Sequence, residues 1–184
     1  MRPSPTDAPA APPLVRHYVR RFFTSLSRRP PSTVDAAWAA SVATPAEHAL
    51  LARLSNQDRR HLIDSARQVQ VALGPDADPV WLRAALLHDV GKHHAGLGVI
   101  GRSFATVAAY GLGHARVRAW SARSGLAGRI GRYELHGEIG ADELRAAGSP
   151  APVAEWSALH HHRDRFAASA IPPDVLAVLD AADH

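Results

Sequence analysis

Helix-start signals recur along the chain and constrain its fold more than any other feature. A hydroxyl side chain is followed three positions later by an acid at Ser32, Thr44 and Ser55, which is the pattern of a capping box. Alternating apolar and polar residues, the pattern of half-buried strands, do not occur. The sequence therefore predicts an all-α protein, with further helices at about 57–73, 79–90, 134–147, 150–163 and 173–183.

The chain divides into a short N-terminal region and one domain. Residues 1–13 are rich in proline and alanine, which predicts a disordered tail. Residues 14–29 combine an apolar stripe with arginines, which predicts a basic amphipathic helix that packs on the domain or docks on a membrane surface or a partner. Residues 30–184 can form a single domain with its own core. Within it, residues 93–132 predict two or three short helices.

Composition excludes several classes of protein. The chain contains no cysteine, so any bound metal must be held by nitrogen and oxygen ligands. Residues 1–29 hold six arginines and one acid, and the rest of the chain is nearly neutral, so the domain is not expected to bind nucleic acid. Neither a membrane-spanning stretch nor a secretory signal is apparent. We expect a cytoplasmic protein, with residues 14–29 as the candidate contact to a membrane.

Polar side chains occupy positions on the apolar faces of the predicted helices. Asp89 continues the stripe formed by Leu82 and Leu86, and His88 lies beside it. Burial of an imidazole and a carboxylate is costly unless a partner compensates them. The same placement recurs on other helices, at His61, His136, His160 and Asp180. A shared cation explains the repetition, because coordination satisfies the lone pairs and neutralises the carboxylates.

The ligand types indicate which metal the site would hold. Imidazole and carboxylate together favour manganese, iron or zinc, with magnesium as a further option. The number of candidate ligands is sufficient for one or two divalent ions. Asp89 is then the candidate to bridge a pair of ions, since a carboxylate has two oxygens.

The order of these residues resembles the HD-domain superfamily of metal-dependent phosphohydrolases. The resemblance rests on His61, on the string LLHDVGK at residues 86–92 and on a late aspartate, Asp180, and it covers about residues 45–184. It implies an HD-type helical bundle. The chain is most similar to the HD-GYP branch, because HGEIGADEL at 136–144 and the adjacent histidines 160 and 161 stand where that branch has additional metal ligands. The loop RDRF at 163–166 departs from the branch, whose loop there is associated with cyclic-di-GMP.

The resemblance implies a role for each matching residue. A first metal would be held by His61, His88, Asp89 and Asp180. A second metal would be held by Asp89 together with His136, His160 and His161. Lys92, the only lysine in the chain, would face the substrate phosphate and act with Asp89 in catalysis. His93 and His94 would line the entrance and contact the substrate.

The expected activity is hydrolysis of a nucleotide or a related phosphate ester by a metal-activated water. A cyclic-dinucleotide phosphodiesterase is an alternative enzyme, although the departure at 163–166 disfavours it. A non-catalytic signalling domain that binds a nucleotide or a metal is an alternative of a different class. The retained set of inward polar residues favours catalysis, because a pure scaffold has no physical reason to bury them.

Overall fold

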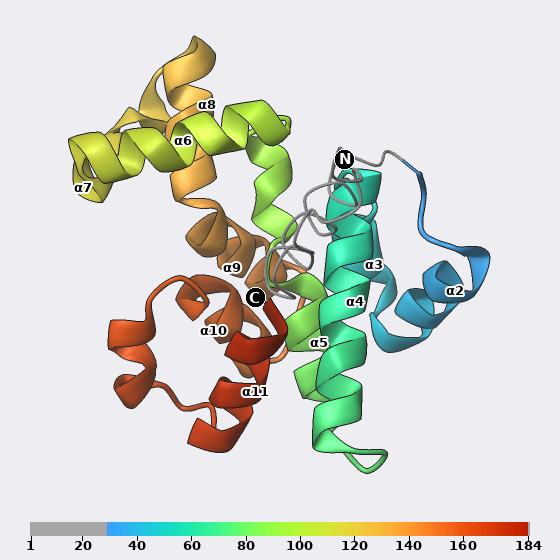
Figure 1. Ribbon diagram of the computed structural model, residues 1–184. Coiled ribbons are helices and arrows are strands. Elements are labelled where there is room, and N and C mark those ends of the chain that lie inside the picture. The colour runs from blue at the N-terminus through green and yellow to red at the C-terminus, as the bar shows by residue number, and fades with distance from the viewer. Residues whose placement is uncertain (1–28, 184) are drawn as a thin grey trace, which may run out of the picture.

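The computed structural model describes residues 29–183, in which the regular elements are all helical (Figure 1). The helices are α2 (Thr33–Val42), α3 (Pro45–Leu51), α4 (Asn56–Leu73), α5 (Pro79–Leu87), α6 (Val99–Leu112), α7 (His114–Arg118), α8 (Gly125–Glu134), α9 (His136–Ala146), α10 (Ala151–Leu159) and α11 (Pro173–Asp183). Three-ten helices are η1 (Val90–His94), η2 (Ala119–Ala122) and η3 (Arg163–Ala168). The predicted all-α class is confirmed for this part of the chain. The predictions for residues 1–13 and 14–28 lie outside it.

The helix starts agree with the capping signals in the sequence. The side chains of Ser32, Thr44 and Ser55 each accept a hydrogen bond from a backbone N–H in the first turn of α2, α3 and α4. Two helices end earlier than predicted. α5 stops at Leu87 and α10 at Leu159, so His88 and His160 lie just past a helix end. The segment 93–132 contains α6, α7, η2 and α8.

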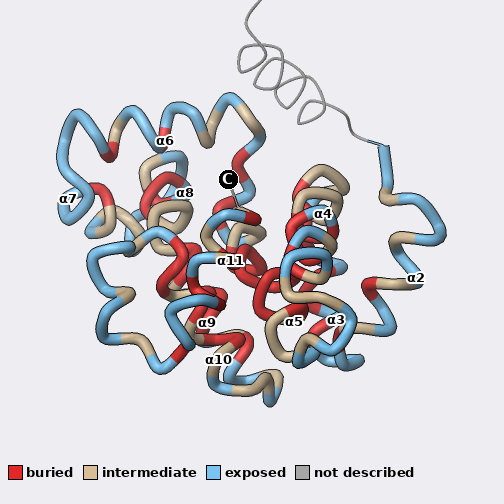
Figure 2. The backbone as a smooth tube through the Cα atoms, turned by 60° about the horizontal axis from the view of Figure 1, so that its bottom comes forward, coloured by how far each residue is buried: buried red, intermediate tan, exposed pale blue. Residues whose placement is uncertain are grey.

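The apolar core falls into two clusters. The larger one lies among α4, α5, α9, α10 and α11, and its fully buried side chains include Leu62, Leu86, Leu144 and Trp156. The buried stretches of the tube in Figure 2 concentrate in these helices. The smaller cluster lies between α6, α7 and α8, which stand beside the main bundle (Figure 1). Among the described residues no single helix has the length and apolar character of a membrane span, although the bent pair Pro79–His94 and Val99–Leu112 meets those criteria jointly.

An ion pair connects the main bundle with the group of α6, α7 and α8. Arg102 on α6 donates through Nη2 to Asp58 Oδ2 on α4 at 2.6 Å, and Nη1 contacts the other oxygen. Burial opposes ionisation of Asp58, but the Arg102 guanidinium outweighs it and holds the pKa of this carboxyl below its usual value. α6 is therefore held near the start of α4, in the same turn that Ser55 caps.

Glu47 forms a second polar connection inside the main bundle. Its carboxylate is completely buried and accepts hydrogen bonds from Arg83 on α5, from Ser149 at 2.7 Å and from the backbone N–H of Thr44 at 2.8 Å. Burial raises the pKa of Glu47, yet these donors, Arg83 first, outweigh it and the net pKa is lowered. The carboxylate therefore joins α3, α5 and the loop before α10.

We expect Glu47→Gln to destabilise the fold by about 3 kcal/mol, because it leaves the Arg83 guanidinium without its buried counter-ion. Asp142→Asn is a matched control, since Asp142 and Arg145 form an exposed pair that contributes at most about 1 kcal/mol. Urea unfolding of both variants measures the difference. Equal losses would contradict the role of Glu47.

The pairing of Glu47 with Arg83 also predicts that the stability of the fold depends on pH in the acid range. A carboxyl group whose pKa is lower in the folded state than in the unfolded state stabilises the fold at pH values above its unfolded pKa. This stability is lost as the pH falls through the folded pKa. The native protein should therefore lose stability below about pH 4.5, near the ordinary glutamate pKa, with a steeper slope than Glu47→Gln. Urea titrations at pH 3 to 7 test this, and parallel curves would contradict it.

Candidate metal centre

The ends of three helices meet at the centre of the main bundle. His88 and Asp89 follow the end of α5, His136 begins α9, and His160 follows the end of α10. All four side chains are almost completely buried, and Asp89 is 1% exposed. The prediction that these polar residues point inward is confirmed. His61 on α4 lies at the same centre but is half-buried, with its side chain 31% exposed.

The buried histidines share one orientation. In each ring Nδ1 lies against the backbone carbonyl three residues earlier: His88 donates to Ala85 at 2.9 Å, and His160 donates to Ser157 at 2.7 Å. His136 makes the equivalent contact with Tyr133. A carbonyl can only accept, so Nδ1 carries a proton, and in the neutral ring Nε2 keeps a free lone pair. In metal-binding histidines, the ring nitrogen that does not bind the metal typically donates to a carbonyl or carboxylate in this way. At His88 burial disfavours the charged ring, but the neighbouring Asp89 and Asp183 outweigh burial and raise the pKa of the ring.

One group of potential ligand atoms comes from α4, the end of α5 and α11. It consists of His61, His88 and Asp183, whose ligand atoms all lie within 4.8 Å of one another. Oδ1 of Asp183 is 3.3 Å from Nε2 of His61 and 3.0 Å from Nε2 of His88. These distances match those between neighbouring ligands of a single ion.

The late aspartate at this centre is Asp183, and the prediction of Asp180 is corrected. The carboxylate of Asp180 instead receives Arg163 from η3, with both N–O contacts at 2.9 Å. α11 buries Leu176 and Leu179, and both aspartates adjoin that stripe. The helix is oriented so that the aspartate one turn later reaches His88.

A second group adjoins the first, since the ligand atoms of His88, Asp89 and His160 also lie within 4.8 Å of one another. It consists of His136, His160 and His161, with the Nε2 atoms of His136 and His161 3.2 Å apart. Oδ1 of Asp89 is 3.0 Å from His136 Nε2 and 3.4 Å from His160 Nε2. The structure therefore places two of these histidines, His136 and His160, around one oxygen of Asp89, and His161 lies next to His136.

Asp89 stands between the two groups, with one oxygen toward each. Its Oδ2 lies 3.5 Å from His88 Nε2 and accepts from Lys92 Nζ. His88 Nε2, Asp89 Oδ1 and His160 Nε2 are buried, and none of them makes a hydrogen bond. Three unsatisfied polar atoms in one core are costly unless a further ligand completes them.

Burial and charge act in opposite directions on the ionisable groups. Burial disfavours the Asp89 carboxylate, but Lys92 and His88 outweigh it and hold its pKa well below the usual range. Burial lowers the pKa of His160 to about 4, and burial together with the neighbouring His160 and His136 lowers that of His161 to about 2. These two imidazoles are therefore neutral at pH 7, the state that a metal ligand needs.

The three residues predicted to contact the substrate, Lys92, His93 and His94, divide between two places. Lys92 lies on η1, pairs with Asp89 and keeps its side chain 15% exposed. Burial disfavours the Lys92 ammonium, but Asp89 outweighs it and raises its pKa. His93 and His94, by contrast, direct their Nε2 atoms to Glu143 on α9, at 3.6 Å and 3.1 Å.

Close contacts between backbones hold the helix ends together, and sequence reasoning missed them. A Cβ on Gly91 would lie 2.1 Å from the carbonyl oxygen of His136, and one on Gly137 would lie 2.6 Å from that of Ser157. The buried Ser157 hydroxyl contacts the carbonyls of His88 at 2.7 Å and Gly137 at 3.1 Å. The sequence does contain a signal for these contacts, because glycines lie close to the histidines at Gly91 and in the HGEIGA segment at 136–141.

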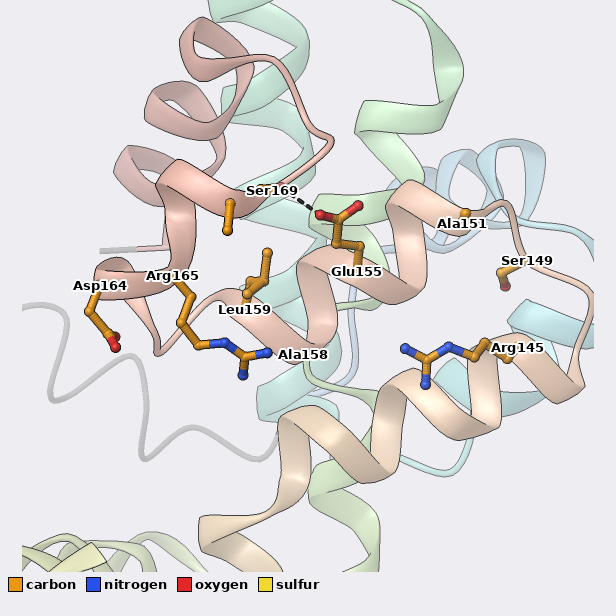
Figure 3. Close-up of a pocket in the computed structure, with 10 residues that line it drawn as sticks. Arg145, Ser149, Ala151, Glu155, Ala158, Leu159, Asp164, Arg165 and Ser169 are labelled. Carbon is orange, nitrogen blue, oxygen red and sulfur yellow. Dashed lines mark hydrogen bonds between the residues drawn. The ribbon is translucent and has the colours of Figure 1, made fainter.

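A groove of about 740 Å³ lies elsewhere on the surface, along α10 (Figure 3). The side chains of Arg145 and Arg165 point toward each other across it, and Glu155 accepts from Ser169 at its edge. None of the histidines or aspartates of the buried centre lines this groove. It is therefore separate from the metal-ligand groups.

Comparisons of the chain with protein-family models, with curated proteins and with solved structures return no match. The resemblance to the HD superfamily thus rests on the motifs themselves. The structure itself shows that residues on or next to five helices bring potential metal-ligand atoms together at one buried centre.

We expect Gly91→Ala to destabilise the protein by about 3 kcal/mol, because the new methyl group would overlap backbone atoms of α9 that cannot move independently. Gly111→Ala is the matched control: nothing lies within 4 Å of its added Cβ, and alanine is favoured in a helix by about 1 kcal/mol. Thermal melts should separate the two by opposite signs. A neutral Gly91→Ala would show that η1 does not pack closely on α9.

Proposed function

We propose that this protein is a metal-dependent phosphohydrolase that uses a pair of divalent ions. The observation that carries the proposal is the position of Asp89. It is a buried carboxylate with one oxygen near His136 and His160 and the other beside His88. A carboxylate placed this way is suited to bridge two cations.

The side chains present fit such ions. Asp183, His61 and His88 would hold one ion, and His136, His160 and His161 would hold the other. The unsatisfied Nε2 atoms and the unsatisfied Asp89 oxygen would find their partners in the ions. The nitrogen-rich donor set favours manganese, iron or zinc over calcium.

Bound divalent ions would lower the pKa of a water molecule and offset charge on a phosphoryl group, which is the chemistry that hydrolysis needs. The chain itself supplies the positioning. The carbonyls behind His88, His136 and His160 fix each ring, and Ser157 fixes the backbone that carries His88. The site is thereby held rigid before a substrate arrives, which limits the reorganisation needed during reaction.

Lys92 is the residue we propose to contact the substrate. Its ammonium lies next to Asp89 and remains partly exposed, so it can reach a phosphate oxygen without leaving the centre. A lysine offers three donors on a flexible stem, whereas the other basic residues of the chain are arginines. A phosphate ester of a small molecule, a nucleotide among them, matches this charge.

A non-catalytic signalling domain with the same ligands is the alternative. Protein ligands that filled every coordination position of both ions would favour this signalling role, because water and substrate could not bind the ions. The partial exposure of His61 and Lys92 favours catalysis instead, because solvent and substrate can reach the centre. Cyclic dinucleotides belong in the substrate screen, although RDRF forms η3 and its Arg163 is engaged by Asp180.

The primary test combines elemental analysis of the purified protein with a phosphate-release screen. Metal-free protein is loaded with Mn²⁺, Fe²⁺ or Zn²⁺ and assayed on nucleotides, sugar phosphates and cyclic dinucleotides. We expect two metal equivalents at the Asp89 centre and metal-dependent release of phosphate or nucleotide. Metal binding without turnover of any phosphate ester would support the signalling domain.

We expect Asp183→Asn to weaken Mn²⁺ binding at least about tenfold and to reduce phosphate release in parallel, because one carboxylate ligand is lost. Asp180→Asn is the matched control on the same helix, three residues away, where the carboxylate pairs with Arg163. It should retain the native metal affinity. The reverse order of effects would return the ligand role to Asp180.

Asp89→Ala should abolish activity and weaken metal binding more than any single histidine change, because like-charged ions lose the carboxylate between them. Ligand linkage then predicts that Mn²⁺ raises the melting temperature of the native protein strongly and that of the variant little. Asp142→Ala removes an exposed carboxylate and serves as the control. Retention of both activity and the Mn²⁺ effect in Asp89→Ala would contradict the mechanism.

A further inference from the structure

A third group of ligand atoms lies apart from the buried centre, where η1 meets α9. It consists of His93, His94 and Glu143, whose ligand atoms lie within 4.8 Å of one another. The two imidazole rings are adjacent, with centroids 4.0 Å apart. Glu143 follows His136 by seven residues on α9, so the group is roughly 10 Å along the helix from that ligand.

His93 has the orientation of the buried histidines. Its Nδ1 donates to the carbonyl of Val90 at 2.8 Å. This contact assigns the proton to Nδ1 and leaves the Nε2 lone pair directed at Glu143, 3.6 Å away. The same relation of ring to carbonyl occurs at His88 and His160, so η1 presents a second imidazole prepared as a ligand.

The carboxylate of Glu143 is incompletely satisfied. Its side chain is 18% exposed, and Oε2 is buried and makes no hydrogen bond. The other oxygen, Oε1, lies 3.1 Å from His94 Nε2 and 3.1 Å from Arg53 Nη1. Glu143 thus has one buried oxygen without a partner, Oε2, and places its other oxygen, Oε1, near two imidazoles. A carboxylate in this position can accept an additional ligand of positive charge.

We propose that His93, His94 and Glu143 form a separate zinc site that links η1 to α9. Ligands at about 2.0–2.2 Å in a tetrahedron are about 3.3 Å apart, and the observed separations of 3.1 Å and 3.6 Å lie on either side of this value. Two imidazoles and one carboxylate are a donor set that zinc accepts. His94 is 39% exposed, so a water can occupy the fourth position.

Arg53 supplies a diagnostic feature. Its guanidinium neutralises Glu143 from the connection between α3 and α4, and its side chain is 53% exposed. A cation at this carboxylate repels the guanidinium, and the exposed arginine can swing away into solvent. Removal of Arg53 should therefore strengthen zinc binding at this group. If zinc binding depended only on the local fold that Arg53 helps to stabilise, removal of Arg53 would weaken it instead.

Equilibrium dialysis of the full chain against buffered Zn²⁺, followed by elemental analysis, tests the site. The double variant His93→Gln, His94→Gln should bind one zinc equivalent fewer than the native protein. His94→Gln alone should weaken this equivalent at least about tenfold without altering a buried residue. His114→Gln is the control, because His114 contacts Glu134 without a second imidazole, and it should keep the native stoichiometry.

Arg53→Gln completes the test and should tighten the same zinc equivalent severalfold. Unchanged stoichiometry in the double variant, or weaker zinc binding in Arg53→Gln, would overturn the site. These outcomes are independent of the phosphohydrolase proposal, because they concern a zinc equivalent that remains when Asp183→Asn has lost metal from the buried centre. Loss of this equivalent in Asp183→Asn would also overturn the assignment to a separate site.

Discussion

The compensation of one buried carboxylate, Asp89, shapes the middle of this structure. A carboxylate that is 1% exposed has lost nearly all of its hydration, and that loss is costly unless charge and hydrogen bonds replace it. Lys92 supplies one positive charge from the next turn. The remaining neighbours are imidazoles, which supply lone pairs as readily as protons. The environment is thus suited to a cation that binds the carboxylate and the imidazoles together.

Such an environment requires that chain segments approach more closely than side chains usually allow. Gly91, Gly137 and Gly140 lie where α9 contacts η1 and α10, and a Cβ at any of them would come within 3 Å of a neighbouring atom. Ser157 then joins the same segments through two carbonyls. Because the nearest atoms at Gly91 and Gly137 belong to the backbone, side-chain rotamer changes alter the approach of these segments little. Rigid placement would matter for a metal site, whose ligands must remain near the ion.

Much of this arrangement follows from the sequence, and the rest depends on tertiary packing. Periodicity placed His88, His136 and His160 on apolar faces, and burial confirms that placement. Asp180 and Asp183 both adjoin the stripe of Leu176 and Leu179. Which of the two aspartates faces the buried centre is therefore determined by how α11 is rotated against α4. Glu143 and His93 are fifty positions apart in the sequence, and their approach depends on the glycine contacts between η1 and α9. Propensity and spacing along one helix contain no information about such contacts.

Charge at the buried centre also bears on what the site would bind. Two carboxylates, Asp89 and Asp183, face one ammonium and several imidazoles. His160 and His161 are neutral at pH 7, whereas at His88 burial is outweighed by Asp89 and Asp183, which raise its pKa. A single divalent ion is nearly balanced by such a shell, whereas a pair of ions leaves a large positive excess in a medium that screens charge weakly. That excess favours hydroxide over water and a phosphate dianion over a neutral ester. Metal number and substrate preference are therefore linked through the small number of carboxylates, and a centre with two ions would select anionic phosphate esters by charge before any contact with the remainder of the substrate.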